Sequence, residues 1–214
     1  LTLLFTASIL YYFKTKTKFR PLKILVAYAT SIGFISLICL CCILSLNIVT
    51  SLSNQLNLIL LIVSSSLLTL YGKYNSKKIA FKNITLSSPK IVKPHTFVFI
   101  SDIHIGTQNS QHLEKIVQHI NEINPEFLLI GGDLIDSSAT TLNDLIALKS
   151  LKMPIYFITG NHEYYSGVES WLEETDKLGM INLINEHRLI SKDGKKIMMA
   201  GITDFRAHFI KKSH

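Results

Sequence analysis

The sequence divides into two parts by the pattern of its apolar positions. No Asp, Glu, Lys, Arg or His occurs from Ile24 through Gly72. Within this segment Ile24–Leu46 and Leu58–Leu70 are apolar, and Asn47–Asn57 collects Asn, Gln, Ser and Thr residues. A helix needs about 20 apolar residues to cross a bilayer core. The pattern therefore predicts two membrane-spanning helices in residues 24–72, with a buried hairpin of a soluble core as the alternative.

A further apolar run and a basic segment precede these helices. Leu1–Phe13 is too short to span, and because the chain begins with Leu we expect a membrane helix cut by the start of the sequence. A secretory signal peptide fits poorly, because the basic segment 14–23 follows this apolar run instead of preceding it. Segment 14–23 and the lysines of residues 73–82 flank the hairpin on one side. The positive-inside rule then predicts a cytoplasmic second half.

From Thr96 onward, short β-rich runs alternate with helical patterns. Strands are predicted at Phe97–Ile100, Phe127–Ile130, Ile155–Ile158, Ile181–Ile184 and Lys196–Ala200. Apolar residues at helical spacing predict helices between them: one with Ser110 as N-cap, one from about Leu142, and one from Val168 to Gly179. A turn is expected at Asn185–Arg188. Such alternation predicts an α/β domain with a largely parallel sheet and flanking helices.

The expected organisation is a partial transmembrane helix at 1–13, a basic loop at 14–23, two transmembrane helices at 24–72, a linker at 73–95 and an α/β domain at 96–214. Residues 1–72 contribute +5 of the net charge of +7. Because this excess lies beside apolar stretches, it indicates contact with anionic lipid and argues against nucleic-acid binding. The three cysteines all lie in the apolar part, so neither a disulfide framework nor a zinc cage is expected.

Each of the first three predicted strands is followed by side chains that bind metals or transfer protons. They are Asp102 and His104, then Asp133 and Asp136, then Asn161, His162 and Glu163. In parallel sheets, ligands gather beyond the carboxyl ends of the strands. Carboxylate, imidazole and amide oxygen without thiolate suit Mn, Fe, Zn or Ni. Two such ions about 3.5–4 Å apart stabilise the attacking and leaving oxygens of an in-line displacement.

Asp102-Ile103-His104, Gly132-Asp133-Leu134-Ile135-Asp136 and Gly160-Asn161-His162-Glu163 resemble the first three motifs of the calcineurin-like metallophosphoesterases. Gly201-Ile202-Thr203-Asp204 resembles a segment of the bacterial membrane-associated branch, whose members also carry apolar N-terminal helices. The resemblance extends over roughly Phe97 to Phe205. It implies a metallophosphoesterase-like sheet in the domain at 96–214.

The resemblance also implies a ligand set for two divalent metal ions. Asp102 and His104 would hold the first ion, Asp133 would bridge the pair, and Asn161 would hold the second. A hydroxide that bridges the two ions would attack phosphorus in line.

Four further residues are expected around these ligands. By the same resemblance, His162 would contact the phosphoryl group or protonate the leaving oxygen. Asp136 is expected either to form hydrogen bonds within the turn of the site or to cap the next helix. Glu163 is expected to support the turn or a metal ligand. Asp204 is a site candidate by resemblance.

The family completes its metal pair with downstream histidines that end in a Gly-His-x-His motif. His208 and His214 do not lie in such a motif. We therefore expect the sequence to be truncated at both ends, so that the 214 residues alone can be inactive.

These observations predict a membrane-anchored, metal-dependent phosphoesterase that hydrolyses a phosphomonoester, phosphodiester or diphosphate. A lipid-linked phosphate is an attractive substrate, with the plasma or inner membrane as the location. The alternative is a non-catalytic, membrane-tethered metal- or phosphate-binding module of the same fold. A channel or transporter is disfavoured, because the apolar helices carry no ionisable residue of the kind that marks a transport pathway.

Overall fold

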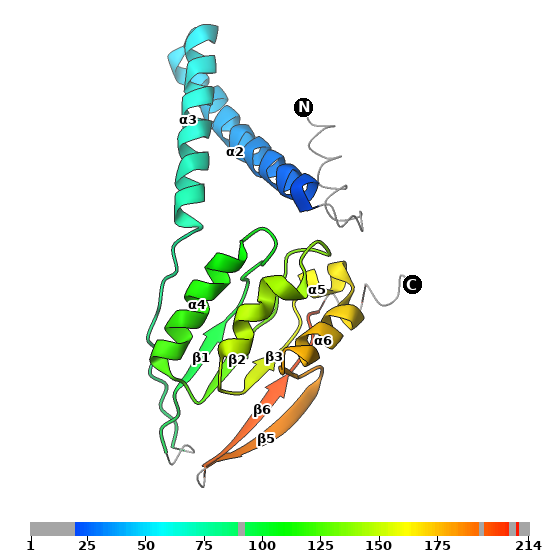
Figure 1. Cartoon of the computed structure of the whole chain (residues 1–214). Helices are drawn as coiled ribbons and strands as arrows, with labels where there is room; N and C mark the ends of the chain where they lie inside the picture. Colours follow the sequence, from blue (N-terminus) through cyan, green and yellow to red (C-terminus); the bar gives the residue numbers. More distant parts are fainter. Residues whose placement is uncertain (1–19, 90–92, 193–194, 206–208, 210–214) are drawn as a thin grey trace. The chain divides into compact units, whose positions relative to one another are not determined.

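The computed structural model describes residues 20–89, 93–192, 195–205 and 209 (Figure 1). Contacts divide the chain into a first unit that includes Pro21–Phe81 and a second that includes Lys82–His214, and each is described by itself. The predicted partial helix at 1–13 and residues 14–19 of the predicted basic loop lie outside the described residues, as do His208 and His214.

The first unit is a pair of long helices, α2 (Arg20–Thr50) and α3 (Asn54–Asn75). Both exceed the predicted apolar runs, since α2 begins inside the expected basic loop and α3 ends inside the expected linker. The polar turn is correspondingly short. Ser53 is the N-cap of α3, and its hydroxyl accepts the Leu56 N–H, which allows a helix to begin among polar residues.

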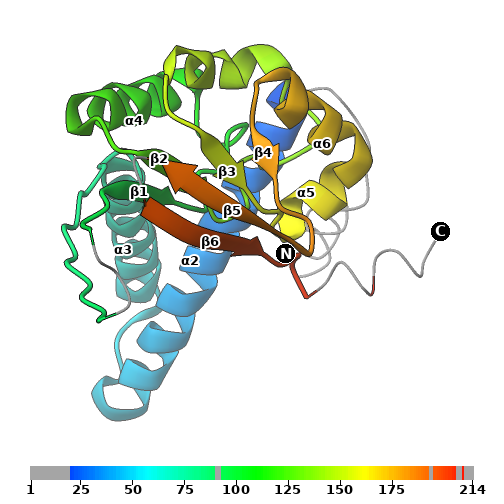
Figure 2. The same ribbon diagram turned by 90° about the horizontal axis from the view of Figure 1, so that it is seen from below.

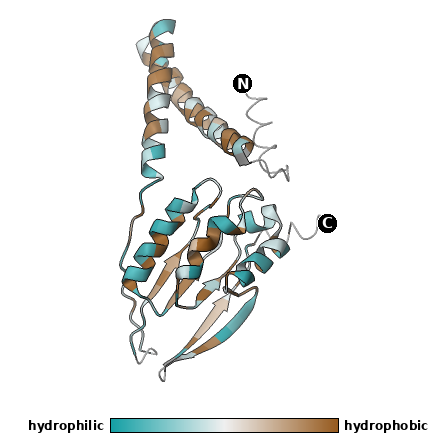
Figure 3. Ribbon diagram, in the orientation of Figure 1, coloured by the Kyte–Doolittle hydropathy of each residue, from teal (hydrophilic) through white to brown (hydrophobic). Residues whose placement is uncertain are grey.

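These two helices are long and apolar enough to cross a membrane, with candidate spans at Ile24–Thr50 and Asn54–Asn75. Figure 3 shows apolar residues along most of the length of both helices. Only 11% and 6% of the respective apolar windows are buried, which is unlike the core of a soluble protein. The hydroxyls of Ser45 and Thr69 bond back to main-chain carbonyls four residues earlier, so these polar groups are satisfied without water.

The second unit contains a four-stranded parallel sheet in the order β1-β2-β3-β4. The strands are β1 (Phe97–Ile100), β2 (Phe127–Ile130), β3 (Ile155–Phe157) and β4 (Ile181–Asn182). Phe97 pairs with Phe127, and Leu128 pairs with Ile155, so the carboxyl ends of these strands lie at one edge of the sheet. The parallel sheet that the sequence predicted is therefore present.

Helices connect these strands. They are α4 (Ser110–Ile123), the 3-10 helix η1 (Leu142–Ser150), α5 (Asn161–Ser166) and α6 (Val168–Lys177). The amphipathic face of α4 buries Leu113 and Ile120 completely. Its N-cap is Asn109 and not the predicted Ser110, because the Asn109 side chain accepts the His112 N–H. The predicted second helix forms as a 3-10 helix, and α5 was not predicted.

An antiparallel hairpin of β5 (Glu186–Lys192) and β6 (Lys195–Gly201) covers the face of the sheet opposite α4 (Figure 2). Ile190 and Ile197 of the hairpin pack on a core of Phe127, Tyr156 and Leu183. The predicted turn at Asn185–Arg188 is wrong. Within this stretch only Asn185 has the left-handed conformation of a turn, and the residues that follow it pair with β6. The pairing lets alternate apolar side chains of the hairpin pack, partly buried, against the core.

Candidate metal centre

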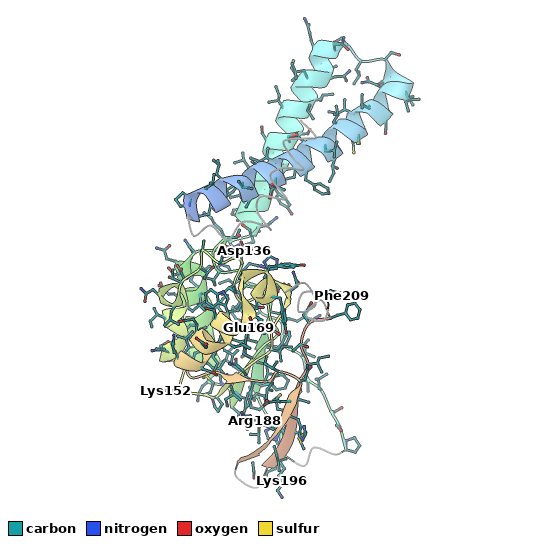
Figure 4. All side chains as sticks on the ribbon, turned by 90° about the vertical axis from the view of Figure 1, so that its right-hand side faces the viewer. Asp136, Lys152, Glu169, Arg188, Lys196 and Phe209 are labelled. Carbon is teal, nitrogen blue, oxygen red and sulfur yellow. The ribbon has the colours of Figure 1, made fainter. Side chains whose placement is uncertain are left out.

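The turns that follow β1 and β2 run side by side at the carboxyl edge of the sheet. The main-chain N–H of His104 donates to the Asp133 carbonyl over 3.0 Å, and the N–H of Ile105 donates to the Leu134 carbonyl over 2.9 Å. In return, the Asp136 N–H donates to the Ile105 carbonyl over 2.9 Å. These hydrogen bonds hold the main chains of the two turns together, and the side chains that the turns carry are thereby brought to one place. Figure 4 shows Asp136 at this end of the unit and Lys196 of the hairpin at the other.

The turn after β3 joins this edge through two glycines. Gly132 has a φ of +88°, and a Cβ there would overlap the main chain of Gly160. A Cβ on Gly160 would in turn overlap the carboxylate of Asp133. Only glycine fits at either position, so these two residues set how closely the second and third turns approach.

Three side chains from three turns form a group that could hold a metal ion. One ligand atom from each of His104, Asp133 and His162 lies within 4.8 Å of the other two. Nε2 of His104 lies 3.9 Å from Asp133 Oδ2 and 3.9 Å from Asp102 Oδ1. The imidazole rings of His104 and His162 meet edge to face with their centroids 4.5 Å apart. The structure thus groups His162 with expected metal ligands, whereas the resemblance gave it a role toward phosphate.

The donor set fits a divalent transition metal. Donors that bind one ion at about 2.1 Å lie at most about 4.2 Å apart, so the group needs only a small contraction to close on an ion. Burial, followed by the proximity of His162, lowers the pKa of His104. A lowered pKa keeps the imidazole neutral, which is the form that binds metals.

The backbone carries strain at these ligands. Asp102, His104 and Asp133 have φ values of 55°, 52° and 50°, in the left-handed region that residues other than glycine rarely adopt. Each such residue costs about 1 kcal/mol or more, and such strain clusters at functional sites. The chain holds three strained residues at one edge, which supports a functional role for that edge.

Glu163 is a buried carboxylate that fastens the turn after β2 to the turn after β3. Oε1 accepts the N–H groups of Leu134 and Ile135 over 2.9 and 3.3 Å, and Oε2 accepts those of Asp133 and Gly160 over 3.0 and 2.8 Å. Burial raises the pKa of Glu163, and the hydrogen bonds from the main chain oppose this shift. Its side chain therefore supports the turns that carry Asp133 and His162.

Asp136 lies behind the two histidines. Its Oδ1 is 3.5 Å from Nδ1 of His104 and 3.6 Å from Nδ1 of His162, and its Oδ2 accepts the Thr107 hydroxyl over 2.7 Å. Of the two roles expected for Asp136, hydrogen bonding within the turn is the one observed, since Thr141 is the N-cap of the next helix. Burial raises its pKa to about 6, although the nearby His162 lowers it.

The main chain of Asp136 also orients His162. Nδ1 of His162 lies 2.8 Å from the Asp136 carbonyl oxygen. A carbonyl oxygen only accepts hydrogen bonds, so Nδ1 carries the proton and the lone pair of the neutral ring is on Nε2.

Two further predicted site residues, Asn161 and Asp204, are located by their neighbours in the chain. Asn161 is half-buried and begins α5 directly before His162, which places it at the same edge. Asp204 follows β6, where the side chain of Asn185 accepts the Thr203 N–H over 3.1 Å. Both stay predicted site residues. Nothing in the sequence singled out Thr107, because a lone threonine matches no metal-binding motif and its partner Asp136 is 29 residues away.

Known proteins resemble this chain over about half of its length or more. A zebrafish (Danio rerio) transmembrane protein with metallophosphoesterase domain is 31% identical over 72% of the chain and 38% of its own length. A bovine (Bos taurus) protein of the same description is 36% identical over 53% of this chain and 28% of the bovine protein's length. An uncharacterized metallophosphoesterase of Helicobacter pylori is 34% identical over 45% of the chain and 27% of its own length. The chain thus spans well under half the length of these relatives.

Residues 95–208 match the calcineurin-like phosphoesterase family, which is more than half of the chain. The match includes every residue of the group described above. The chain belongs to the calcineurin-like phosphoesterase family.

Proposed function

We propose that the protein is a membrane-anchored phosphoesterase that works with two divalent metal ions. The observation that supports this most directly is the convergence of His104, Asp133 and His162, from three successive strand ends, within 4.8 Å. The left-handed backbone of Asp102, His104 and Asp133 also supports a functional site at this edge, because such strain persists where the surrounding structure holds charged groups in place.

Asp102 and His104 would hold one ion, Asp133 would reach both, and Asn161 would hold the other. When bound, such ions neutralise the charge of a phosphate and supply a nucleophile at neutral pH. This assignment of ligands is part of the proposal. Its support is the position of Asp133 between the other two turns and the neutral state that burial favours for His104.

His162 would face the phosphoryl group through Nε2. Its Nδ1–H is held by the Asp136 carbonyl, so the ring cannot rotate without losing a hydrogen bond of 2.8 Å. A ring held in this way can donate a proton from Nε2 to the leaving oxygen once it is protonated there. Asp136, near both histidine rings, would stabilise that positive charge.

The two apolar helices support membrane anchoring, and relatives are named transmembrane proteins. Anchoring brings the site near lipids, so we propose a lipid-linked phosphate or diphosphate as the substrate class, with the domain in the cytoplasm as the positive-inside rule predicts.

The test uses the full-length protein, purified in detergent and treated with a chelator. Re-addition of Mn²⁺ is expected to restore hydrolysis of bis-p-nitrophenyl phosphate. Asp133→Asn and Asn161→Ala should abolish it, while Asp144→Asn, an acid in the capping box of η1, should leave it unchanged. No turnover with any divalent metal from a folded protein would reject the proposal in favour of the binding module.

The substrate class is tested separately with matched concentrations of a lipid-linked diphosphate in mixed micelles and a soluble nucleoside diphosphate. Faster release of phosphate from the lipid substrate is expected. Hydrolysis of the nucleotide alone would reject the lipid assignment without affecting the proposed reaction.

A further inference from the structure

Thr107 contacts the site from outside every motif. It lies three residues after His104 in the turn that follows β1, and its hydroxyl donates to Oδ2 of Asp136 over 2.7 Å. The other carboxylate oxygen, Oδ1, faces Nδ1 of His104 at 3.5 Å. The carboxylate therefore lies between a hydroxyl and an imidazole, both from the same turn.

The local chain geometry holds Thr107 against Asp136. Ile105 and Ile135 form a parallel bridge between the two turns. The Thr140 hydroxyl donates to the Ile105 carbonyl over 2.6 Å. Gly106 is buried at this point with a φ of +126°, and a Cβ there would lie 2.6 Å from the Thr140 hydroxyl oxygen. The turn is consequently tight, and it brings the next residue back over Asp136.

The two ring nitrogens of His104 face different carboxylates. Among the described residues, Nδ1 is buried and makes no hydrogen bond, although Asp136 Oδ1 lies 3.5 Å away. Closing this gap by about half an ångström would form an ordinary hydrogen bond. On the other side of the ring, Nε2 faces Asp102 and Asp133. A carboxylate behind a metal-binding histidine fixes its tautomer and orientation.

We propose that Thr107 is a positioning residue of the metal centre. Its hydroxyl holds Oδ2 of Asp136, so that Oδ1 stays behind the His104 ring, keeps the proton on Nδ1 and directs the lone pair of Nε2 toward the metal. This inference rests on the proposed function, because it takes His104 as a metal ligand.

Two variants separate the hydroxyl from the rest of the side chain. Thr107→Val keeps the shape and removes the donor, whereas Thr107→Ser keeps the donor. Thr141→Val is the matched control, because the Thr141 hydroxyl also donates to an aspartate, Asp144, over 2.9 Å in the exposed capping box of η1.

The first readout is the affinity of the full-length protein for Mn²⁺ and Zn²⁺ by titration calorimetry. Thr107→Val is expected to weaken binding about tenfold, in the range seen when partners of metal ligands are removed. Thr107→Ser should stay within about twofold of the wild type, and Thr141→Val should bind as the wild type does.

The second readout is independent of metal. Nitrogen-15 spectra of the histidine rings in the chelated protein report the tautomer of His104, assigned by its loss in His104→Gln. The Nδ1–H form should dominate in the wild type and in Thr107→Ser and decrease in Thr107→Val.

The proposal is overturned if Thr107→Val keeps both the affinity and the tautomer, or if Thr107→Ser is as weak as Thr107→Val. A wild-type protein that binds metal but hydrolyses no ester rejects the proposed function alone. A wild-type protein that binds no divalent ion rejects both.

Discussion

The main-chain N–H of His162 donates to Oδ1 of Asp133 over 2.9 Å, so a residue after β3 is fastened by a side chain from the turn after β2. The second oxygen of the same carboxylate lies 3.9 Å from Nε2 of His104. One carboxylate thus joins all three turns of the site. It can do so because Gly160, beside it, has no side chain.

Gly160→Ala should therefore damage the metal site. A methyl group would displace the Asp133 carboxylate, which loses its bond to His162 and its approach to His104. We expect the affinity for Mn²⁺ to fall at least about tenfold, measured by titration calorimetry. Gly179→Ala is the control, since a Cβ meets nothing within 4 Å there and only its φ of +80° is strained. It should cost about 1 kcal/mol of stability and leave binding unchanged. Equal affinities of the two variants would contradict the prediction.

His162→Gln distinguishes the two roles open to this histidine. If His162 acts on the phosphoryl group, the variant should keep its metal content and lose about 10²- to 10⁴-fold in kcat, because a glutamine cannot transfer the proton. Metal content by elemental analysis and kcat with bis-p-nitrophenyl phosphate provide the two measurements. Loss of bound metal in the variant would instead make His162 a ligand, as its place in the group allows.

Glu163→Gln should destabilise the second unit by about 3 kcal/mol. In the wild type, main-chain N–H groups donate to both carboxylate oxygens, and the glutamine would place an NH₂ group against some of these donors. Urea unfolding monitored by fluorescence of Trp171, the one tryptophan of the chain, measures the change. Glu169→Gln, an exposed acid in the first turn of α6, is the comparison and should shift stability by less than about 0.5 kcal/mol. Similar unfolding midpoints for the two variants would show that the four hydrogen bonds to Glu163 contribute little.

Asp136 should give the metal-free protein a dependence of stability on pH. Burial raises its pKa to about 6, so the folded state favours the neutral carboxyl group. The neutral carboxyl group contributes to the free energy of unfolding, and this contribution is fully present below about pH 4, the pKa of aspartate in the unfolded chain. That contribution is lost as pH rises through the folded pKa. Relative to Asp136→Asn, which stays neutral, the free energy of unfolding of the chelated wild type should fall between about pH 4 and pH 7. The same urea assay, repeated across this range, measures it, and parallel profiles of the two proteins would contradict the assignment.

Local patterns were sufficient for much of the fold. Strand β1 at Phe97–Ile100 and strand β2 at Phe127–Ile130 have the predicted bounds, because short continuous apolar runs between turn residues are typical of strands in a parallel sheet. The two long helices were likewise predicted by their lack of charge. By contrast, the first residues of strand β5 (Glu186–Lys192) were predicted to be part of a turn. They are polar and exposed, and they are extended because they pair with β6, which their local sequence does not indicate.

The sequence by itself determined which chemical groups reach the edge of the sheet, because residues that directly follow parallel strands lie at the carboxyl edge, where ligands bind. Asp102, His104, Asp133 and His162 could therefore be named in advance. The tertiary structure decided how they are held. The Glu163 carboxylate accepts N–H groups from the turn after β2, and the Thr107 hydroxyl donates to Asp136, so both contacts join residues nearly 30 positions apart in the chain. Such contacts depend on the exact approach of two turns, which backbone packing fixes and a linear pattern does not encode.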